Sequence, residues 1–167
     1  RNPGMPYVGW MLLAVAALSW WNRGKSYKDW RIPPNLYYFA WILLGVGYTL
    51  SGWHKLQSPS WQEGLALSYL LENPLSRPGF VSELLQQCPP FLMKIMTWGA
   101  LALELLAAPM MLIPRLRLWS WLGLMSMHIG IMVTVDFVDL TMGMILIHLF
   151  VADERWLRPR GGEGVVY

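Results

Sequence analysis

Five apolar stretches, separated by polar and proline-containing segments, dominate the hydrophobic pattern of the chain. The stretches are residues 7–21, 35–56, 91–113, 118–135 and 140–152. A membrane-spanning helix needs about 20 mostly apolar residues. The first stretch has only about 15, so at ~1.5 Å per residue it is short for a ~30 Å hydrocarbon core. It is expected as a tilted span or as an interfacial helix. The pattern predicts an all-α fold, a polytopic membrane helical bundle of four to five spans.

The connection between the second and third stretches, residues 57–90, is long for a helical bundle. Within it, residues 61–71 place Trp61, Leu65 and Tyr69 at helical spacing. We predict an amphipathic helix here that lies on the outer membrane interface and covers the bundle. The alternative is an ordinary loop helix that has no role in a site.

Composition supports a lipid environment. The chain is 55% hydrophobic and 14% charged, whereas ordinary soluble domains carry about 25% charged residues. Its 11 tryptophans are typical of the aromatic belts at membrane interfaces. The net charge of +3 is too small and too scattered to indicate a nucleic-acid partner. Cys88 is the only cysteine, so no internal disulfide and no metal-cluster spacing is present, and no metal site is expected.

The pattern divides the chain into three parts. Residues 1–34 are expected to form a short N-terminal membrane segment and a basic cytoplasmic loop, and residues 35–156 the helical bundle. Residues 157–167, which contain GGEGVVY, are expected to be a disordered tail. The sequence has no initiator methionine and no signal-peptide pattern. We therefore expect the chain to be processed or to be part of a longer protein.

The distribution of basic residues orients the predicted bundle. If every stretch spans, one face carries nine of the 13 lysines and arginines, namely Arg23, Lys25, Lys28, Arg31, Arg115, Arg117, Arg155, Arg158 and Arg160. Because short cytoplasmic loops are enriched in basic residues, this face is predicted to be cytoplasmic, as is the C-terminus. We expect an integral membrane protein of a bacterial inner membrane, surrounded by lipid, with Lys55 on the outer side.

Three ionisable residues lie at depth within the predicted spans. Glu104 and His128 are each about midway along their stretches, and His148 is well inside the last one. Such residues are costly in lipid and usually face the interior of a bundle. A Glu104–His128 pair is geometrically allowed. The alternatives are polar contacts that only hold helices together, a functional site, or axial histidine ligands, His128 and His148, to a haem or chlorophyll-type macrocycle.

His54 and Lys55 end the second stretch. Lys55 is either an anchor whose ammonium reaches the headgroups or a desolvated base that is turned into the bundle. On a helix His54 points about 100° away from Lys55, so the two do not share one pocket. The candidate catalytic residues are Lys55, His128 and Glu104. The candidate cofactor-binding residues are His128, His148 and His54.

The order of these residues resembles a known family. Tyr48-x-x-Ser51-Gly52-x-x-Lys55-Leu56 is followed by Trp61-x-x-Gly64, Glu104, a basic turn and His128. This order is similar to the horizontally transferred transmembrane (HTTM) domain, the membrane part shared with vitamin K-dependent gamma-carboxylases, over about residues 35–156. In the carboxylases the lysine that matches Lys55 is implicated as the base that starts vitamin K oxygenation on the lumenal side. His128 matches a family histidine.

The chain also departs from the family. It begins where the family has already supplied earlier helices, including another histidine of the carboxylase site. No part of these 167 residues corresponds to the lumenal β-rich domain that engages the peptide substrate, and His54 stands where the carboxylases tend to carry a second lysine. Carboxylation of a protein glutamate is therefore not implied.

Two functions remain open. The first is a non-catalytic accessory or structural subunit of a larger membrane complex, packed against other membrane protein subunits and offering a groove for a lipid, quinone or pigment. The second is a small membrane enzyme of the carboxylase-like type that uses Lys55 as a base on a quinol, with Glu104 and His128 shaping the pocket.

Overall fold

A computed structural model describes residues 4–26, 29–153 and 156 of the chain. These residues form α-helices and no β-strand, with one isolated antiparallel bridge between Ser76 and Val135. In chain order the helices are α1 (Gly4–Trp21), α2 (Pro34–Leu56), α3 (Pro59–Gln62), α4 (Ala66–Glu72), α5 (Phe80–Gln86), α6 (Pro90–Leu105), α7 (Ala107–Leu112), α8 (Arg117–Thr134) and α9 (Val138–Phe150). The predicted all-α class is confirmed.

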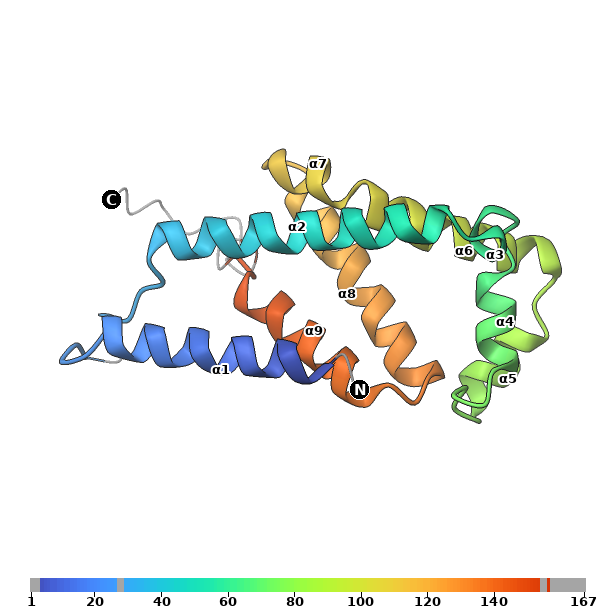
Figure 1. Ribbon diagram of the computed structural model, residues 1–167, viewed down its shortest axis with the longest axis horizontal. Helices are drawn as coiled ribbons and strands as arrows, with labels where there is room; N and C mark the ends of the chain where they lie inside the picture. Colours follow the sequence, from blue (N-terminus) through green and yellow to red (C-terminus); the bar gives the residue numbers. More distant parts are fainter. Residues whose placement is uncertain (1–3, 27–28, 154–155, 157–167) are drawn as a thin grey trace.

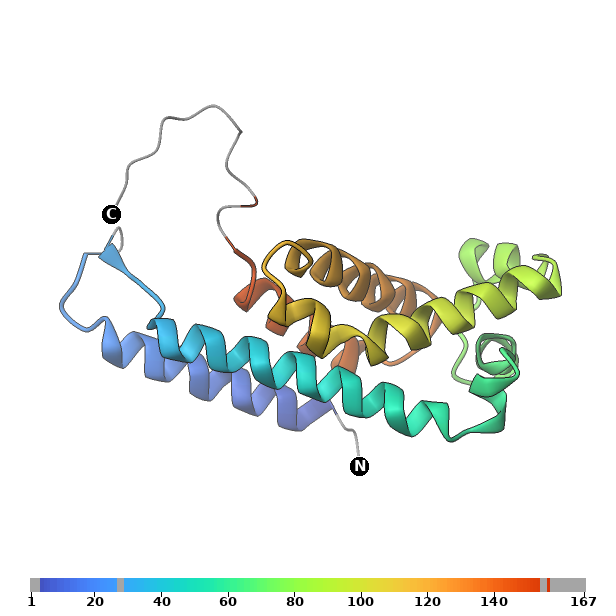
Figure 2. The same cartoon turned by 90° about the horizontal axis from the view of Figure 1, so that it is seen from above.

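Helix α2 extends along most of the long axis of the molecule, and the short helices α3, α4 and α5 lie beyond its C-terminal end (Figure 1). Seen from above, α6 and α7 run beside α2 (Figure 2). Helix α9 packs against both α1 and α8. The buried core joins these layers, with Trp41, Leu44 and Tyr48 from α2 packed among Ala107, Met111, Leu124 and Val151.

The predicted apolar stretches are all helical, and α2 and α8 match residues 35–56 and 118–135 to within one residue at each end. Within the described ranges, no helix has both the length and the apolar character that crossing a membrane requires. Four to five membrane spans therefore stay a prediction. The disordered tail predicted for residues 157–167 lies outside the described residues.

The third stretch, residues 91–113, is not one helix as predicted but two, α6 and α7, which meet at Leu106. The cause is Pro109. Proline has no backbone N–H, and its ring clashes with the carbonyl of the residue four positions earlier, here Leu105. The interruption leaves backbone polar groups inside the bundle that need partners from elsewhere.

Thr49 on α2 supplies those partners. Its hydroxyl oxygen accepts a hydrogen bond from the Ala108 N–H at 3.0 Å and lies 3.3 Å from the Leu105 carbonyl oxygen, to which the hydroxyl can donate. The Glu104 carbonyl oxygen is 3.4 Å away, an alternative acceptor for the same proton. One side chain of α2 therefore holds the junction between α6 and α7 in register.

Thr49→Val is expected to lower the free energy of unfolding by about 1–3 kcal/mol, because the substitution keeps the shape but leaves buried backbone groups unsatisfied. Denaturant unfolding in mild detergent, followed by circular dichroism, measures the change. Thr49→Ser keeps the hydroxyl and is the matched control. Equal stability of the valine variant and the wild type would contradict the bridging role of Thr49.

The single amphipathic helix predicted over residues 61–71 is also wrong. The segment contains the end of α3 and most of α4, and Gly64 separates them with a φ of +75°. A side chain at Gly64 would meet Lys94 Cβ on α6 at 3.0 Å. A glycine at this position permits both the left-handed turn and the close approach to α6. Trp61 lies before this turn, on α3, and its ring is 4.8 Å from the Lys55 ammonium on α2.

Candidate functional site

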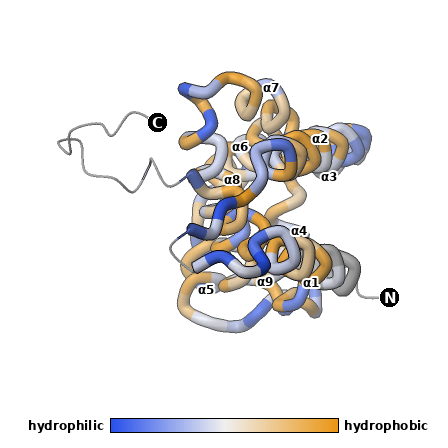
Figure 3. Tube along the Cα trace, turned by 90° about the vertical axis from the view of Figure 1, so that its left-hand side faces the viewer, coloured by the Kyte–Doolittle hydropathy of each residue, from blue (hydrophilic) through white to orange (hydrophobic). Residues whose placement is uncertain are grey.

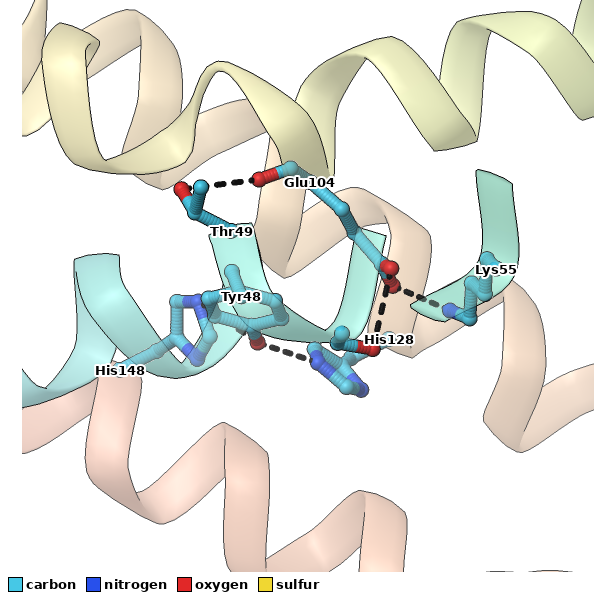
Figure 4. A network of polar contacts seen from close by, with 7 residues as sticks. Tyr48, Thr49, Lys55, Glu104, His128 and His148 are labelled. Carbon is cyan, nitrogen blue, oxygen red and sulfur yellow. Dashed lines mark hydrogen bonds and ion pairs between the residues drawn. The ribbon is translucent and has the colours of Figure 1, made fainter. Parts of the chain in front are cut away.

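Lys55 and Glu104 form an ion pair between α2 and α6. The Lys55 ammonium donates to Glu104 Oε1 at 2.5 Å (Figure 4). The Glu104 side chain is only 4% exposed, and that of Lys55 is 31% exposed. A carboxylate this deeply buried is costly unless it is paired and hydrogen-bonded. The ammonium is therefore the counter-charge that allows Glu104 to be ionised inside the bundle.

Two further groups complete the pair. Ser51, one turn before Lys55 on the same face of α2, donates from its hydroxyl to Glu104 Oε2 at 3.2 Å. The Lys55 ammonium lies 4.8 Å from the centre of the Trp61 ring, a cation–π distance. Both carboxylate oxygens of Glu104 thus have donors, and an indole ring covers the cation.

Gly52 makes this geometry possible. A Cβ atom at Gly52 would lie 2.8 Å from the Leu105 backbone nitrogen and 3.1 Å from Glu104 Cβ. The absence of a side chain lets the two helices approach closely enough for Glu104 to reach the face of α2 that carries Lys55. The spacing Ser51-Gly52-x-x-Lys55 thus corresponds to one contact surface between α2 and α6.

A second buried network lies one turn further back along α2. The Tyr48 hydroxyl is hydrogen-bonded to His128 Nε2 on α8 and lies 3.4 Å from His148 Nε2 on α9 (Figure 4). The three rings are mutual neighbours, with centroid separations of 5.5–5.8 Å. Tyr48, His128 and His148 are 5%, 7% and 0% exposed. Three helices therefore bring three polar rings together in the interior.

His148 is held in position by its neighbours. Its Nδ1 lies 2.8 Å from the Met144 carbonyl oxygen, and since a carbonyl only accepts, Nδ1 carries a proton. The Trp121 indole N–H donates to the His148 carbonyl oxygen at 2.7 Å. His128 Nδ1, by contrast, is buried and has no hydrogen-bond partner among the described residues.

The structure thus places the predicted site residues in two groups. Lys55 and Glu104 lie together, and His128 and His148 lie together. The predicted Glu104–His128 pair is not formed, because Lys55 binds Glu104 and Tyr48 binds His128. His54 is exposed and joins neither network.

The two imidazoles do not suit axial ligation of a macrocycle between them. The Tyr48 hydroxyl occupies the space next to both Nε2 atoms, and a haem or chlorophyll plane would have to displace it. Within the described part of the chain, no three histidine, cysteine, aspartate or glutamate residues are grouped so that they could hold a metal ion.

A surface depression of about 270 Å³ lies elsewhere, between α4 and α5, and Asn73, Arg77, Ser82 and Glu83 are among its lining residues. No residue of the Lys55 or Tyr48 networks lines it. The depression is therefore separate from the candidate site.

Sequence reasoning missed Tyr48 and Ser51 as members of the site. Their positions did carry a signal, since residues 48, 51, 52 and 55 recur at the three- and four-residue spacing of one helix face. Tyrosine in an apolar stretch is easily taken as part of the packing. Comparisons of this chain with models of protein families, with curated proteins and with solved structures gave no match.

Proposed function

We propose that this chain is an HTTM-like membrane protein that carries out acid–base chemistry on a quinol-type molecule, with Lys55 and Glu104 as the reacting pair. The observation that carries the proposal is the ammonium of Lys55 bonded to the buried carboxylate of Glu104. A headgroup anchor does not need a buried counter-ion. An internal pair can pass a proton at little electrostatic cost, because both partners then lose charge together.

The reaction begins at Lys55, the partly exposed member of the pair. The Lys55 ammonium passes one proton to Glu104, and the amine that results takes the proton of a quinol hydroxyl. The ammonium that remains then neutralises the new quinolate oxygen, and Glu104 ends as the neutral acid. One O–H bond breaks at the substrate and one forms at Glu104, so Glu104 is the net base and Lys55 is both relay and counter-charge.

The resemblance to the HTTM family supports this assignment. The matching residues Ser51, Gly52, Lys55, Trp61 and Glu104 all contribute to the pair or to the helix contact around it. In this proposal four to five helices cross a bacterial inner membrane, the C-terminus is cytoplasmic, and Lys55 opens toward the outer side.

Replacement of the pair by Lys55→Met with Glu104→Gln is expected to lower quinol turnover by about 10²–10⁴-fold, the usual contribution of a positioned acid–base group. The double variant leaves no buried charge unpaired, so the fold is retained. The assay follows loss of vitamin K hydroquinone under oxygen with protein purified in mild detergent. Lys94→Met, a lysine variant on α6 outside the network, is the control. Unchanged turnover in the double variant would contradict the proposal.

A second candidate, an accessory subunit of a membrane complex, is favoured by the outer face of α2. Phe39, Ile42, Val46, Leu50 and Trp53 follow one another along that face and are 44–57% exposed. In Figure 3, hydrophobic residues recur along the helices, whereas much of the hydrophilic chain lies in the connections. Such a face suits lipid or another membrane subunit beside a lipid, quinone or pigment groove. Purification in mild detergent with partners in fixed stoichiometry supports this function, and a stable lone monomer contradicts it.

A further inference from the structure

The ring cluster of Tyr48, His128 and His148 has a definite hydrogen-bond direction. His148 Nδ1 donates to the Met144 carbonyl, so in the neutral ring His148 Nε2 is an acceptor. Among the residues that the structure describes, the donor near that atom is the Tyr48 hydroxyl, 3.4 Å away. If the Tyr48 hydroxyl donates to His148, the Tyr48 oxygen can accept a hydrogen bond from His128. His128 Nε2 must then carry the proton.

The opposite direction is less favourable. If Tyr48 donates to His128 Nε2, then the His128 proton sits on Nδ1, which has no partner among the described residues. His148 Nε2 would also face an oxygen that offers it no proton. That arrangement makes one hydrogen bond where the first makes two, and it buries an unsatisfied N–H, which is costly. The hydrogen bonds therefore run from His128 through Tyr48 to His148, each residue donating to the next.

We propose that His128, Tyr48 and His148 form a proton relay in which His128 Nδ1 is the receiving atom and His148 holds the proton. A proton arrives at His128 Nδ1, the Nε2 proton of His128 moves to the Tyr48 oxygen, and the Tyr48 hydroxyl proton moves to His148 Nε2. At the end His128 and Tyr48 are neutral and His148 is an imidazolium. Each residue that gains a proton passes one on, apart from His148, and His128 ends with its proton on Nδ1 instead of Nε2.

The final position of the charge follows from the contacts of the two rings. An imidazolium at His148 has an acceptor for each N–H, the Met144 carbonyl and the Tyr48 oxygen. Within the described part of the chain, an imidazolium at His128 has an acceptor for Nε2–H but none for Nδ1–H. Of the charged groups drawn with the cluster in Figure 4, Lys55 and Glu104 are paired with each other, so neither offers His128 an unshared counter-charge.

This inference rests on the proposed function for the source of the proton. Ser51, bonded to Glu104, lies one turn from Tyr48 on α2, so the acid–base pair and the relay share one helix face. In that function protonated Glu104 is the source of the proton, and because Glu104 is bonded to Lys55 and Ser51 rather than to His128, the transfer to His128 is not direct. The transfer leaves Glu104 ionised and the proton on His148.

Nitrogen NMR of the histidine rings tests the relay without substrate. The chain has three histidines, so ¹⁵N-histidine labelling gives six ring signals, which His54→Gln and His128→Gln assign. The expected spectrum has the proton on Nε2 of His128 and on Nδ1 of His148. On acidification, His148 is expected to give the first imidazolium signal of the two histidines. In Tyr48→Phe, which cannot pass the proton from His128 to His148, His148 is no longer expected to give the first signal.

Tyr38→Phe, the same change on the exposed side of α2, is expected to leave the histidine signals as in the wild type. A wild-type His128 that carries its proton on Nδ1 overturns the relay, as does an imidazolium that forms first at His128. Unchanged spectra in Tyr48→Phe also overturn it. If Tyr48→Phe does not fold, the wild-type tautomers alone decide the question. Absence of quinol turnover would count against the proposed function and would leave this measurement intact.

Discussion

Lys55→Met is expected to lower the free energy of unfolding by about 3–5 kcal/mol, the usual cost of removing one partner of a buried ion pair. The reason is the environment of Glu104, whose side chain is 4% exposed and whose Oε1 is 2.5 Å from the Lys55 ammonium. Without Lys55, the Ser51 hydroxyl is the one donor to the carboxylate that remains among the described residues. It must then stay charged in a poorly solvated site or take up a proton to become neutral, and either course favours the unfolded chain.

A double-mutant cycle separates this effect from a simple loss of packing. Glu104→Gln in the Lys55→Met background removes the stranded charge, so the double variant is expected to recover most of the lost stability. The measurement is denaturant unfolding in mild detergent for all four forms. Two single changes that simply add in the double variant would mean that the pair is not coupled in the folded protein, which would contradict the buried geometry.

The exposed ion pair of the same chain is the natural control. Arg77 and Asp136 are 3.2 Å apart, but their side chains are 39% and 73% exposed. Asp136→Asn is therefore expected to cost no more than about 1 kcal/mol, since water solvates and screens both charges. The two pairs differ chiefly in burial, so the contrast tests whether burial makes the Lys55–Glu104 pair important.

The fold could be predicted from the sequence where the apolar period was uninterrupted. The bounds of α2 and α8 differ from the predicted stretches by one residue. The break at Leu106 had a local signal in Pro109 that the apolar pattern overrode, whereas its partner Thr49, which binds the freed Ala108 N–H, is distant in sequence and could not be inferred. The turn at Gly64 was missed for a similar reason, since it is fixed by contact with α6.

For the site, the sequence indicated which residues are at depth but not which of them meet. The position of a residue along a helix gives its depth in the bundle. On depth alone, Glu104 and His128 were predicted to be able to form a pair. The direction in which each side chain points is set by how the helices pack, and α2 offers Glu104 and His128 different partners. Lys55 binds Glu104 from α6, while Tyr48, seven positions earlier on the same face of α2, binds His128 from α8.

Gly52→Ala is expected to lower the free energy of unfolding by about 1–3 kcal/mol, the usual cost of overpacking. The added Cβ would lie 2.8 Å from the Leu105 backbone nitrogen. A backbone atom cannot move aside as a flexible side chain can, so α6 must shift away from α2. Since Glu104 precedes Leu105, the shift also lengthens its contact with Lys55, and quinol turnover should fall with stability.

Gly47→Ala is the matched control, because the same substitution on the same helix has the opposite expected sign. No described atom lies within 4 Å of a Cβ atom placed at Gly47. Only the backbone effect remains there, and alanine in place of a helical glycine stabilises by roughly 0.5–1 kcal/mol. Helix propensity acts equally at both positions, so the difference between the variants reports the contact between α2 and α6 alone. Two alanine variants that are equally stable would mean that the helices do not approach closely at Gly52, and the Lys55–Glu104 pair could not then form as described.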